Sequence, residues 1–295
     1  MTAEMTATGP SALASSIAAL LDDFSIEMTG KDVANLADAR ASIPAGTRIN
    51  LTYLGHENLA VRLAAAERIK QYGFVPVPHI SARRLGSVDV LEQFLDGLKD
   101  LDAVENVFVV GGDPAEPEGP FADAHSVIRT GLLQRAGATS IGVAGYPDGH
   151  PHITEEALWS ALDAKVETLA AQGTPGTIVT QFGFDVDVVL AWIEATRARG
   201  IDLPIRVGVP GPAGVKRLLA YASRFGVSTS AGIVKKYGFS ITNLIGTPGP
   251  DTFVRELAER YDRAVHGEVK IHFYTFGGLK ATAEWVQSFR KEHRA

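Results

Sequence analysis

The chain contains no cysteine among its 295 residues, so disulfide bonds, thiolate metal sites and cysteine nucleophiles are excluded together. It also lacks an apolar run of about 20 residues, the length that a membrane-spanning helix requires. The first basic residue is Lys31, whereas a signal peptide has basic residues at its start. We therefore expect a soluble protein of the reducing cytoplasm that has no membrane partner.

Concentrated positive charge is missing as well. The formal net charge is -6, and the Lys and Arg residues form no stripe that could neutralise the phosphates of a nucleic acid. Nucleic acid is thus not an expected partner, and small ligands are the better expectation. The acidic composition and the amphipathic helical patterns are compatible with self-association, so a homo-oligomer is a possible partner.

Several motifs with known chemistry are absent. No GxGxxG follows a strand and opens a helix, and neither the P-loop GxxxxGK[ST] nor the esterase GxSxG occurs. There is no HExxH pair, and His150 and His152 flank a proline, so no metal site is expected. Carboxylates, amides and flat surfaces remain, and these suit proton transfer and cofactor-assisted redox chemistry.

Short β-rich runs alternate with amphipathic helical patterns along nearly the whole chain. The runs predict strands at 24–28, 48–53, 74–79, 106–111, 140–146, 177–182, 204–209 and 270–276. Strands interleaved with helices favour an α/β fold, a (β/α)8 barrel of the TIM type, with an open doubly wound sheet as the alternative. The segment between the last two predicted strands, from 209 to 270, is longer than the others and predicts extra helices between strands seven and eight. We expect residues 1–23 to form an N-terminal helical extension and residues 24–295 a single barrel domain.

Nearly every predicted strand ends in a polar side chain. These side chains are Glu27, Thr52, His79, Asp113, Tyr146, Gln181, Tyr274 and Thr275. Each one alone is more often a helix cap or a solvated turn residue. In a barrel, however, the C-terminal strand ends meet at one open face, so the set predicts a small-molecule site there. Gly111 and Gly112 before Asp113 would let a flat ligand approach the main chain.

The ordered motifs "VVGGDP", "GYPDGHP", "TQFGFD" and "HFYTF", together with Glu27, resemble those of the methylenetetrahydrofolate reductase family. "AGYPDGHP" is similar to the family's A-Y-P-E-x-H-P, "VTQFGFD" to its I-T-Q-x-x-F-D, and "HFYTF" to its closing H-F-Y-T-L/M-N. The resemblance implies a barrel that holds FAD at the strand ends. It implies that NAD(P)H reduces the flavin and that methylenetetrahydrofolate then accepts the hydride at the same face.

The resemblance also implies roles for individual residues. Glu27 matches the general acid that protonates a folate nitrogen, which we expect to require a pKa raised toward neutrality by an apolar site covered by the flavin. Asp113 matches the aspartate beside flavin and pterin, and Gln181 the glutamine that orients both substrates. The implied cofactor contacts are Thr52, His79, Gly112, Asp113, Tyr146, His150 and Lys165, and the implied substrate contacts are Glu27, Asp113, Gln181 and Tyr274.

The chain departs from the family at positions that carry charge. Gly111 stands where the family commonly has arginine, and Ala164 where it has a second basic residue beside Lys165, so the strength of FAD binding is open. Gly277 and Gly278 replace an Asn-Arg pair whose arginine can reach the folate tail. Two alternatives are open: Lys235, Lys236 or Lys280 substitutes for that arginine, or the chain recognises the folate polyglutamate tail differently.

Three functions follow from these residues. The first is reduction of 5,10-methylenetetrahydrofolate to 5-methyltetrahydrofolate with NAD(P)H and FAD. The second is a folate-binding protein or methyl-transfer partner on the same barrel, without flavin chemistry. The third is a flavin-dependent barrel that acts on another imine or amine.

Overall fold

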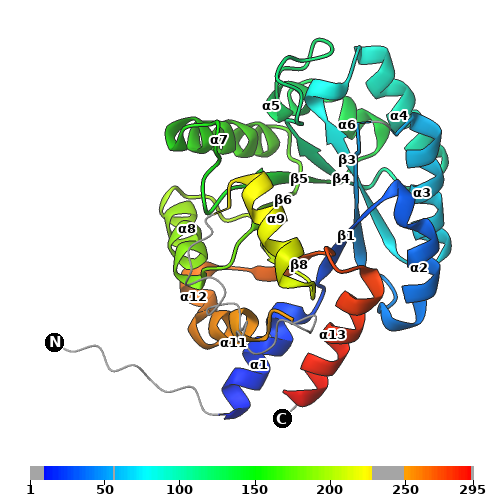
Figure 1. Cartoon of the computed structure of the whole chain (residues 1–295). Coiled ribbons are helices and arrows are strands. Elements are labelled where there is room, and N and C mark those ends of the chain that lie inside the picture. The colour runs from blue at the N-terminus through cyan, green and yellow to red at the C-terminus, as the bar shows by residue number, and fades with distance from the viewer. Residues whose placement is uncertain (1–9, 56, 228–248, 294–295) are drawn as a thin grey trace.

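The computed structural model describes residues 10–55, 57–227 and 249–293, and its parallel strands close into a barrel in the order β1 to β8 (Figure 1). The strands are β1 (Ser25–Thr29), β2 (Arg48–Thr52), β3 (Val75–Ser81), β4 (Asn106–Val110), β5 (Ser140–Gly145), β6 (Gly176–Phe182), β7 (Ile205–Pro210) and β8 (Val269–Tyr274). The predicted TIM-type barrel is confirmed, and each predicted strand is found within about two residues of its place.

Helices surround the barrel and follow its strands. They are α1 (Pro10–Leu21), α2 (Val33–Ala39), α3 (Leu59–Gln71), α4 (Val88–Asp100), α5 (Ala124–Ile128), α6 (Leu132–Ala136), α7 (Glu155–Ala171), α8 (Val186–Ala198), α9 (Val215–Phe225), α11 (Asp251–Arg260), α12 (Arg263–His266) and α13 (Leu279–Glu292). Short 3-10 turns lie at η1 (Gly30–Asp32), η2 (Arg40–Ser42) and η3 (Ala82–Arg84). In the described residues, no helix is long and apolar enough to cross a membrane.

Helix α4 shows how the sequence produces these elements. Leu91, Phe94, Leu95 and Leu98 recur at helical spacing and are all buried against the barrel. The Ser87 side chain accepts a hydrogen bond from the first turn of α4. Similar caps begin other helices, at Asn58, Asp123, Thr154, Asp185 and Asp262.

Inside the barrel, side chains of alternating residues form layers. Val77, Phe108 and Val179 form a small apolar cluster separate from the main core. His79 and Gln181 lie two residues farther along β3 and β6, so the alternation places them above this cluster, toward the C-terminal end. The cluster therefore closes the interior beneath the predicted site.

The predicted extra helices between strands seven and eight are confirmed by α9, α11 and α12. The run at 228–238, read as part of the same set, lies outside the described residues. The glycines of this region are needed for close packing: a Cβ on Gly208 would overlap the Thr180 carbonyl, and one on Gly211 would overlap the Thr282 hydroxyl. Contacts within the protein thus explain Gly208 and Gly211 of the "GVPGPAG" loop, whereas a Cβ on Gly214 would meet open space.

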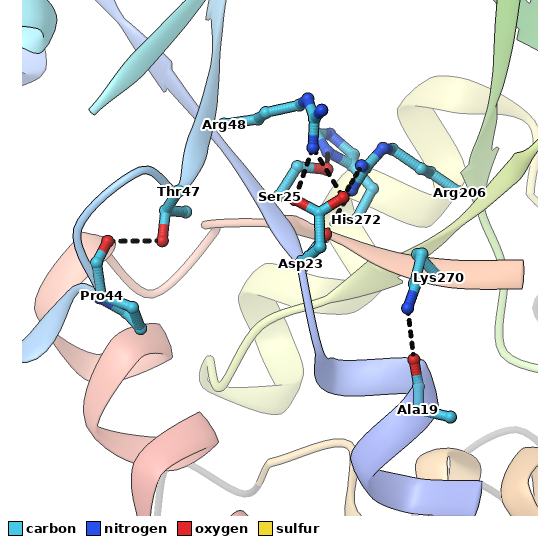
Figure 2. Close-up of polar contacts among 9 residues, drawn as sticks. All are labelled: Ala19, Asp23, Ser25, Pro44, Thr47, Arg48, Arg206, Lys270 and His272. Atoms are coloured by element: carbon cyan, nitrogen blue, oxygen red, sulfur yellow. Dashed lines mark hydrogen bonds and ion pairs between the residues drawn. The ribbon is translucent and has the colours of Figure 1, made fainter.

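At the N-terminal end of the barrel, α1 lies beside α11 and α13 and contacts β8 (Figure 1). Asp23, which follows α1, pairs with Arg48 of β2 and Arg206 of β7, and Lys270 donates to the Ala19 carbonyl (Figure 2). Asp23, Arg48, Arg206 and Lys270 therefore all find partners within the chain.

Candidate active site at the barrel mouth

Glu27 lies on β1, and its side chain is 21% exposed at the C-terminal half of the barrel interior. Its Oε2 is 3.8 Å from Nε2 of His272 on β8. The other ring nitrogen of His272, Nδ1, bonds to the Ser25 hydroxyl at 2.8 Å (Figure 2). Thr275, just after β8, donates to the Glu27 carbonyl at 2.6 Å. Glu27 is therefore held between the first and last strands by a buried polar network.

The electrostatics of Glu27 are those of the protein without a ligand. Burial raises the pKa of Glu27, but contact with His272 and the nearby imidazole of His79 lower it more, so the pKa lies below its ordinary value. The prediction of a pKa raised toward neutrality concerns a site covered by flavin, and it stays a prediction. Without that cover, the imidazoles supplied by β3 and β8 keep the pKa of Glu27 low.

His79 lies on β3 and is fully enclosed. Its Nε2 is 3.5 Å from the Asn50 amide, its ring packs on Phe108 at 4.8 Å between centroids, and Arg62 donates to its carbonyl. Burial lowers the pKa of His79 to about 4, although the charge of Glu27 raises it. His79 is therefore neutral at physiological pH, and it can exchange a hydrogen bond with a ligand without carrying charge.

Two buried polar atoms of this region have no hydrogen-bond partner among the described residues: Thr52 Oγ1 and His272 Nε2. Thr52 lies close enough to Glu27 to lower the pKa of the acid, but no bond of normal geometry joins them. Unpaired buried polar atoms are costly and rare in native proteins. Thr52 Oγ1 is therefore a polar atom that a ligand at the mouth can reach without breaking an existing hydrogen bond.

Asp113 stands in the loop after β4, where Gly112 has a φ of 96° that other residues rarely adopt. The Asp113 carboxylate is 81% exposed, and its Oδ2 lies 3.6 Å from the guanidinium of Arg84. The Arg84 guanidinium in turn lies 3.8 Å from Glu118. Asp113 therefore faces the open side of the mouth, within reach of a bound molecule.

Two tyrosines connect Asp113 with Glu27. Burial and the charge of Asp113 raise the pKa of Tyr146, while burial and then the charges of Glu27 and Tyr146 raise that of Tyr274 well above its usual range. The Tyr274 hydroxyl donates to the Thr180 carbonyl at 3.1 Å, and Thr180 directly precedes Gln181 on β6. The structure thus brings the strand-end groups into one cluster.

Gln181 is half buried near the end of β6, and its side-chain oxygen accepts from the Phe182 amide at 3.0 Å. His150 lies edge-on to Tyr146, with ring centroids 5.6 Å apart, and its Nδ1 accepts from the His152 amide. Both residues border the mouth. Their side-chain positions are consistent with ligand contacts, but which ligand they meet stays a prediction.

Lys165 is placed differently from the other predicted contacts. It lies on the inner face of α7 with Leu162 and Leu169, and its side chain is buried. Burial lowers the pKa of Lys165 to about 8, against the opposing charge of Asp123. Its predicted contact with a diphosphate stays a prediction, since the structure shows this ammonium packed between elements.

The structure explains the departure from the family motif at Gly277 and Gly278, but not the one at Gly111. A Cβ on Gly277 would overlap the Pro212 carbonyl, and Gly278 has a φ of 108°, so this turn takes no larger residue at 277 without moving. A Cβ on Gly111, by contrast, would meet open space. Lys280 is half exposed beside Glu284, whereas Lys235 and Lys236 lie outside the described residues.

Sequence reasoning missed Ser25, His272 and Arg84. Ser25 and His272 lie two residues before Glu27 and Tyr274 on their strands, so the two-residue period places them on the same inward face. That period could have found them, because it points to a second polar layer beneath the strand ends. Arg84 carries no such signal, since its contact with Asp113 depends on how two loops meet.

At the mouth, Thr52 Oγ1 has no hydrogen-bond partner among the described residues, and a Cβ built on Gly111 would meet no atom within 4 Å. These are the positions that the ring of a bound ligand could contact. Within the described ranges, no group of three or more histidine or carboxylate side chains gathers in a way that could hold a metal ion.

Comparison with known proteins agrees with this geometry. The family model described as "Methylenetetrahydrofolate reductase" matches residues 23–289. Methylenetetrahydrofolate reductase 1 of Schizosaccharomyces pombe is 28% identical over 60% of this chain and 29% of its own length. Methylenetetrahydrofolate reductase (NADH) 1 of Arabidopsis thaliana is 25% identical over 68% of this chain and 33% of its own length. The chain thus spans about a third of these relatives.

Among solved structures, an uncharacterized Clostridium thermocellum protein that binds two copies of 5-methyl-5,6,7,8-tetrahydrofolic acid has a similar fold. The match covers 95% of this chain and 99% of that protein, with a TM-score of 0.59 and 10% sequence identity. At this identity the likeness shows the fold alone.

Proposed function

Because the chain belongs to the methylenetetrahydrofolate reductase family, we propose that it reduces 5,10-methylenetetrahydrofolate to 5-methyltetrahydrofolate, with NAD(P)H as reductant and FAD as cofactor. The observation that carries the proposal is Glu27, a carboxyl group held by His272 at the mouth of the barrel among unpaired polar atoms. A cytoplasmic location stays a prediction of the same proposal.

Glu27 is the residue that moves a proton. In the ligand-free protein its lowered pKa keeps it ionised. A ring that covers the mouth removes water from the 21% of the side chain that is exposed, and this desolvation raises the pKa. The bound folate therefore meets an acid that can give its proton to a ring nitrogen from Oε2, and His272 keeps that carboxyl in place.

The other residues bind and orient. Asp113 lies on the exposed side, where its charge stabilises a cationic folate and accepts hydrogen bonds from the pterin. Gln181 can donate and accept through one amide, so it can orient either substrate. Thr52, His79, Tyr146 and Tyr274 offer hydroxyls and a neutral imidazole to ring edges.

Bound FAD would supply hydride transfer from NAD(P)H to the folate, and the groups available to its ring are Thr52 Oγ1, His79 and Tyr146. The cations expected for its diphosphate are not placed as the family motif implies: Gly111 and Ala164 carry no charge, and Lys165 is buried. How the chain holds a diphosphate is therefore a separate question.

The proposal is tested by the visible absorption spectrum of the purified protein under anaerobic conditions. We expect flavin bands that bleach on addition of NADH and return when methylenetetrahydrofolate follows. A protein that stays colourless and inactive with added FAD would contradict the proposal. It would favour the folate-binding alternative, whose check is 5-methyltetrahydrofolate binding by the same sample.

The variant Glu27→Gln separates the two half-reactions. NADH should still bleach the flavin at the parent rate, whereas reoxidation by the folate should slow by about 100-fold or more, since a positioned acid typically contributes that much. Equal slowing of both half-reactions would remove Glu27 from the role of acid. Glu284→Gln, on the outer helix α13, is the matched control and should change neither rate.

A further inference from the structure

Arg84 brings a positive charge to the barrel mouth from an unexpected loop. It belongs to η3, directly after β3, and its guanidinium reaches toward Asp113 in the loop after β4. The neighbouring Arg83 donates its backbone N–H to the Gly111 carbonyl at 2.8 Å. The η3 loop is thus fastened beside Gly111, the position where the family motif has its arginine.

The surroundings of Arg84 hold its side chain in place. It is 19% exposed, and its guanidinium lies 5.8 Å from the centre of the Tyr53 ring. Gly55 lies against the guanidinium so closely that a Cβ there would overlap Nη1. The side chain therefore occupies a formed slot between the loops after β2 and β4.

The donors of Arg84 are not committed to partners. Its ion pairs, at 3.6 Å to Asp113 and 3.8 Å to Glu118, are longer than hydrogen bonds, and the described residues offer it no closer acceptor. The two carboxylates are 81% and 53% exposed, so water screens them and the pairs are weak. A phosphate that accepted parallel hydrogen bonds from the guanidinium would replace them easily.

We infer that Arg84 binds the diphosphate of a dinucleotide at the barrel mouth and so takes the part for which Gly111 has no side chain. The inference rests on the proposed function for the presence of a dinucleotide. FAD and NAD(P)H both carry a diphosphate, and Arg84 can serve either one. Arg83, the preceding residue, adds a second positive charge to the same 3-10 turn.

The test is equilibrium binding to the apoprotein, measured by calorimetry or ligand fluorescence. Arg84→Gln should weaken FAD, NADH or both by about 10- to 100-fold, the range for a hydrogen bond to a charged group. Riboflavin and reduced nicotinamide riboside, which lack the diphosphate, should bind as they do to the parent. Loss for FAD alone or NADH alone identifies which diphosphate Arg84 holds.

Three further variants separate recognition from damage. Arg48→Gln removes an equal charge and an ion pair from the opposite end of the barrel and should leave binding unchanged. Gly55→Ala displaces the guanidinium without removing its charge and should weaken the same dinucleotides. Gly111→Arg, for which the structure leaves open space, should restore binding when combined with Arg84→Gln.

The inference is overturned if Arg84→Gln binds dinucleotides as the parent does, or if riboflavin weakens as much as FAD. It is also overturned if the parent binds neither FAD nor NADH. The proposed function fails separately: a protein that binds FAD through Arg84, but never passes a hydride to methylenetetrahydrofolate, would refute the reductase and leave the inference intact.

Discussion

The two ends of the barrel use similar side chains in opposite ways. At the N-terminal end, Asp23 holds Arg206 at 2.6 Å and also pairs with Arg48, and Thr47 donates to the Pro44 carbonyl at 2.7 Å (Figure 2). At the C-terminal end, Thr52 Oγ1 has no hydrogen-bond partner among the described residues, and His272 Nε2 makes no hydrogen bond, since its neighbour Glu27 Oε2 is 3.8 Å away.

This difference separates stability from binding within one fold. A hydroxyl or a charge that is paired inside the chain lowers the free energy of the folded state, whereas an unpaired one raises it until a ligand arrives. Substitutions at the N-terminal end should therefore change unfolding, and those at the C-terminal end should change binding. The predictions below test this division, beginning with the largest expected effect.

Asp23→Asn should lower the free energy of unfolding by about 2 kcal/mol. It leaves Arg206, whose side chain is 10% exposed, without its charge partner; the loss stays below that of a fully buried pair because Asp23 is 41% exposed. Asparagine tolerates the φ of 55° that Asp23 adopts, so backbone strain does not confuse the result. The measurement is urea unfolding with and without a folate.

The division requires that folded Asp23→Asn binds folate as the parent does. The control is Asp163→Asn, which removes the exposed pair with Arg199 and should cost less than about 1 kcal/mol. If both variants lose the same free energy of unfolding, the ion pairs of Asp23 contribute no more to stability than an exposed surface pair. If Asp23→Asn weakens folate binding by a free energy similar to its loss of stability, the two ends of the barrel are coupled.

A pair of matched threonines tests the comparison at a smaller scale. Thr47→Val removes a hydroxyl that has a partner and should lower the free energy of unfolding by about 1 kcal/mol. Thr52→Val removes one that has none, so it should leave stability unchanged or raise it slightly, while flavin or folate binding weakens by roughly tenfold.

The two substitutions change the same atoms, which makes each the control for the other. Calorimetric unfolding gives the stabilities, and titration of each folded variant with folate gives the affinities. If Thr52→Val loses as much stability as Thr47→Val, then Thr52 already has a partner in the ligand-free protein. In that case the unpaired groups at the mouth would not indicate a ligand.

Much of this arrangement could be predicted from the sequence. Alternation of strand and helix favours the barrel, with an open doubly wound sheet as the alternative. In a barrel the residues that end the strands must share one face, and this predicts that Glu27, Tyr146 and Tyr274 lie together. The inner layer of Ser25 and His272 was within reach of the same two-residue period.

Other features depend on three-dimensional contacts that no local pattern carries. The meeting of Arg84 with Asp113 joins two loops, and Gly277 is required by a carbonyl of Pro212, far away in the chain. The pKa of Glu27 depends on which side chains the other strands aim at it. A sequence identifies an acid at a strand end, but not the imidazoles that lower its pKa.

A prediction on pH dependence extends the comparison to protons. Asp148 follows β5 and lines a cavity of about 220 Å³ together with Tyr146, Trp159 and Trp192. Burial, and then the charge of Asp185, raise the pKa of Asp148 to about 6 from the ordinary value of 3.8. Between these values the folded protein holds a proton that the unfolded chain has released, so this contribution to stability is lost as pH rises from 3.8 through about 6.

Asp148→Asn should remove that pH dependence, and the difference in unfolding free energy between parent and variant, measured from pH 4 to 7, isolates it. The contribution of His79 to stability depends on pH in the opposite direction. Its pKa is lowered to about 4, so this contribution is lost as pH falls from 6.5. That contribution is common to both proteins and cancels if the sites are independent. A difference that does not vary with pH would mean that Asp148 ionises as in water, so the cavity would be open to solvent like the exposed face of Asp113.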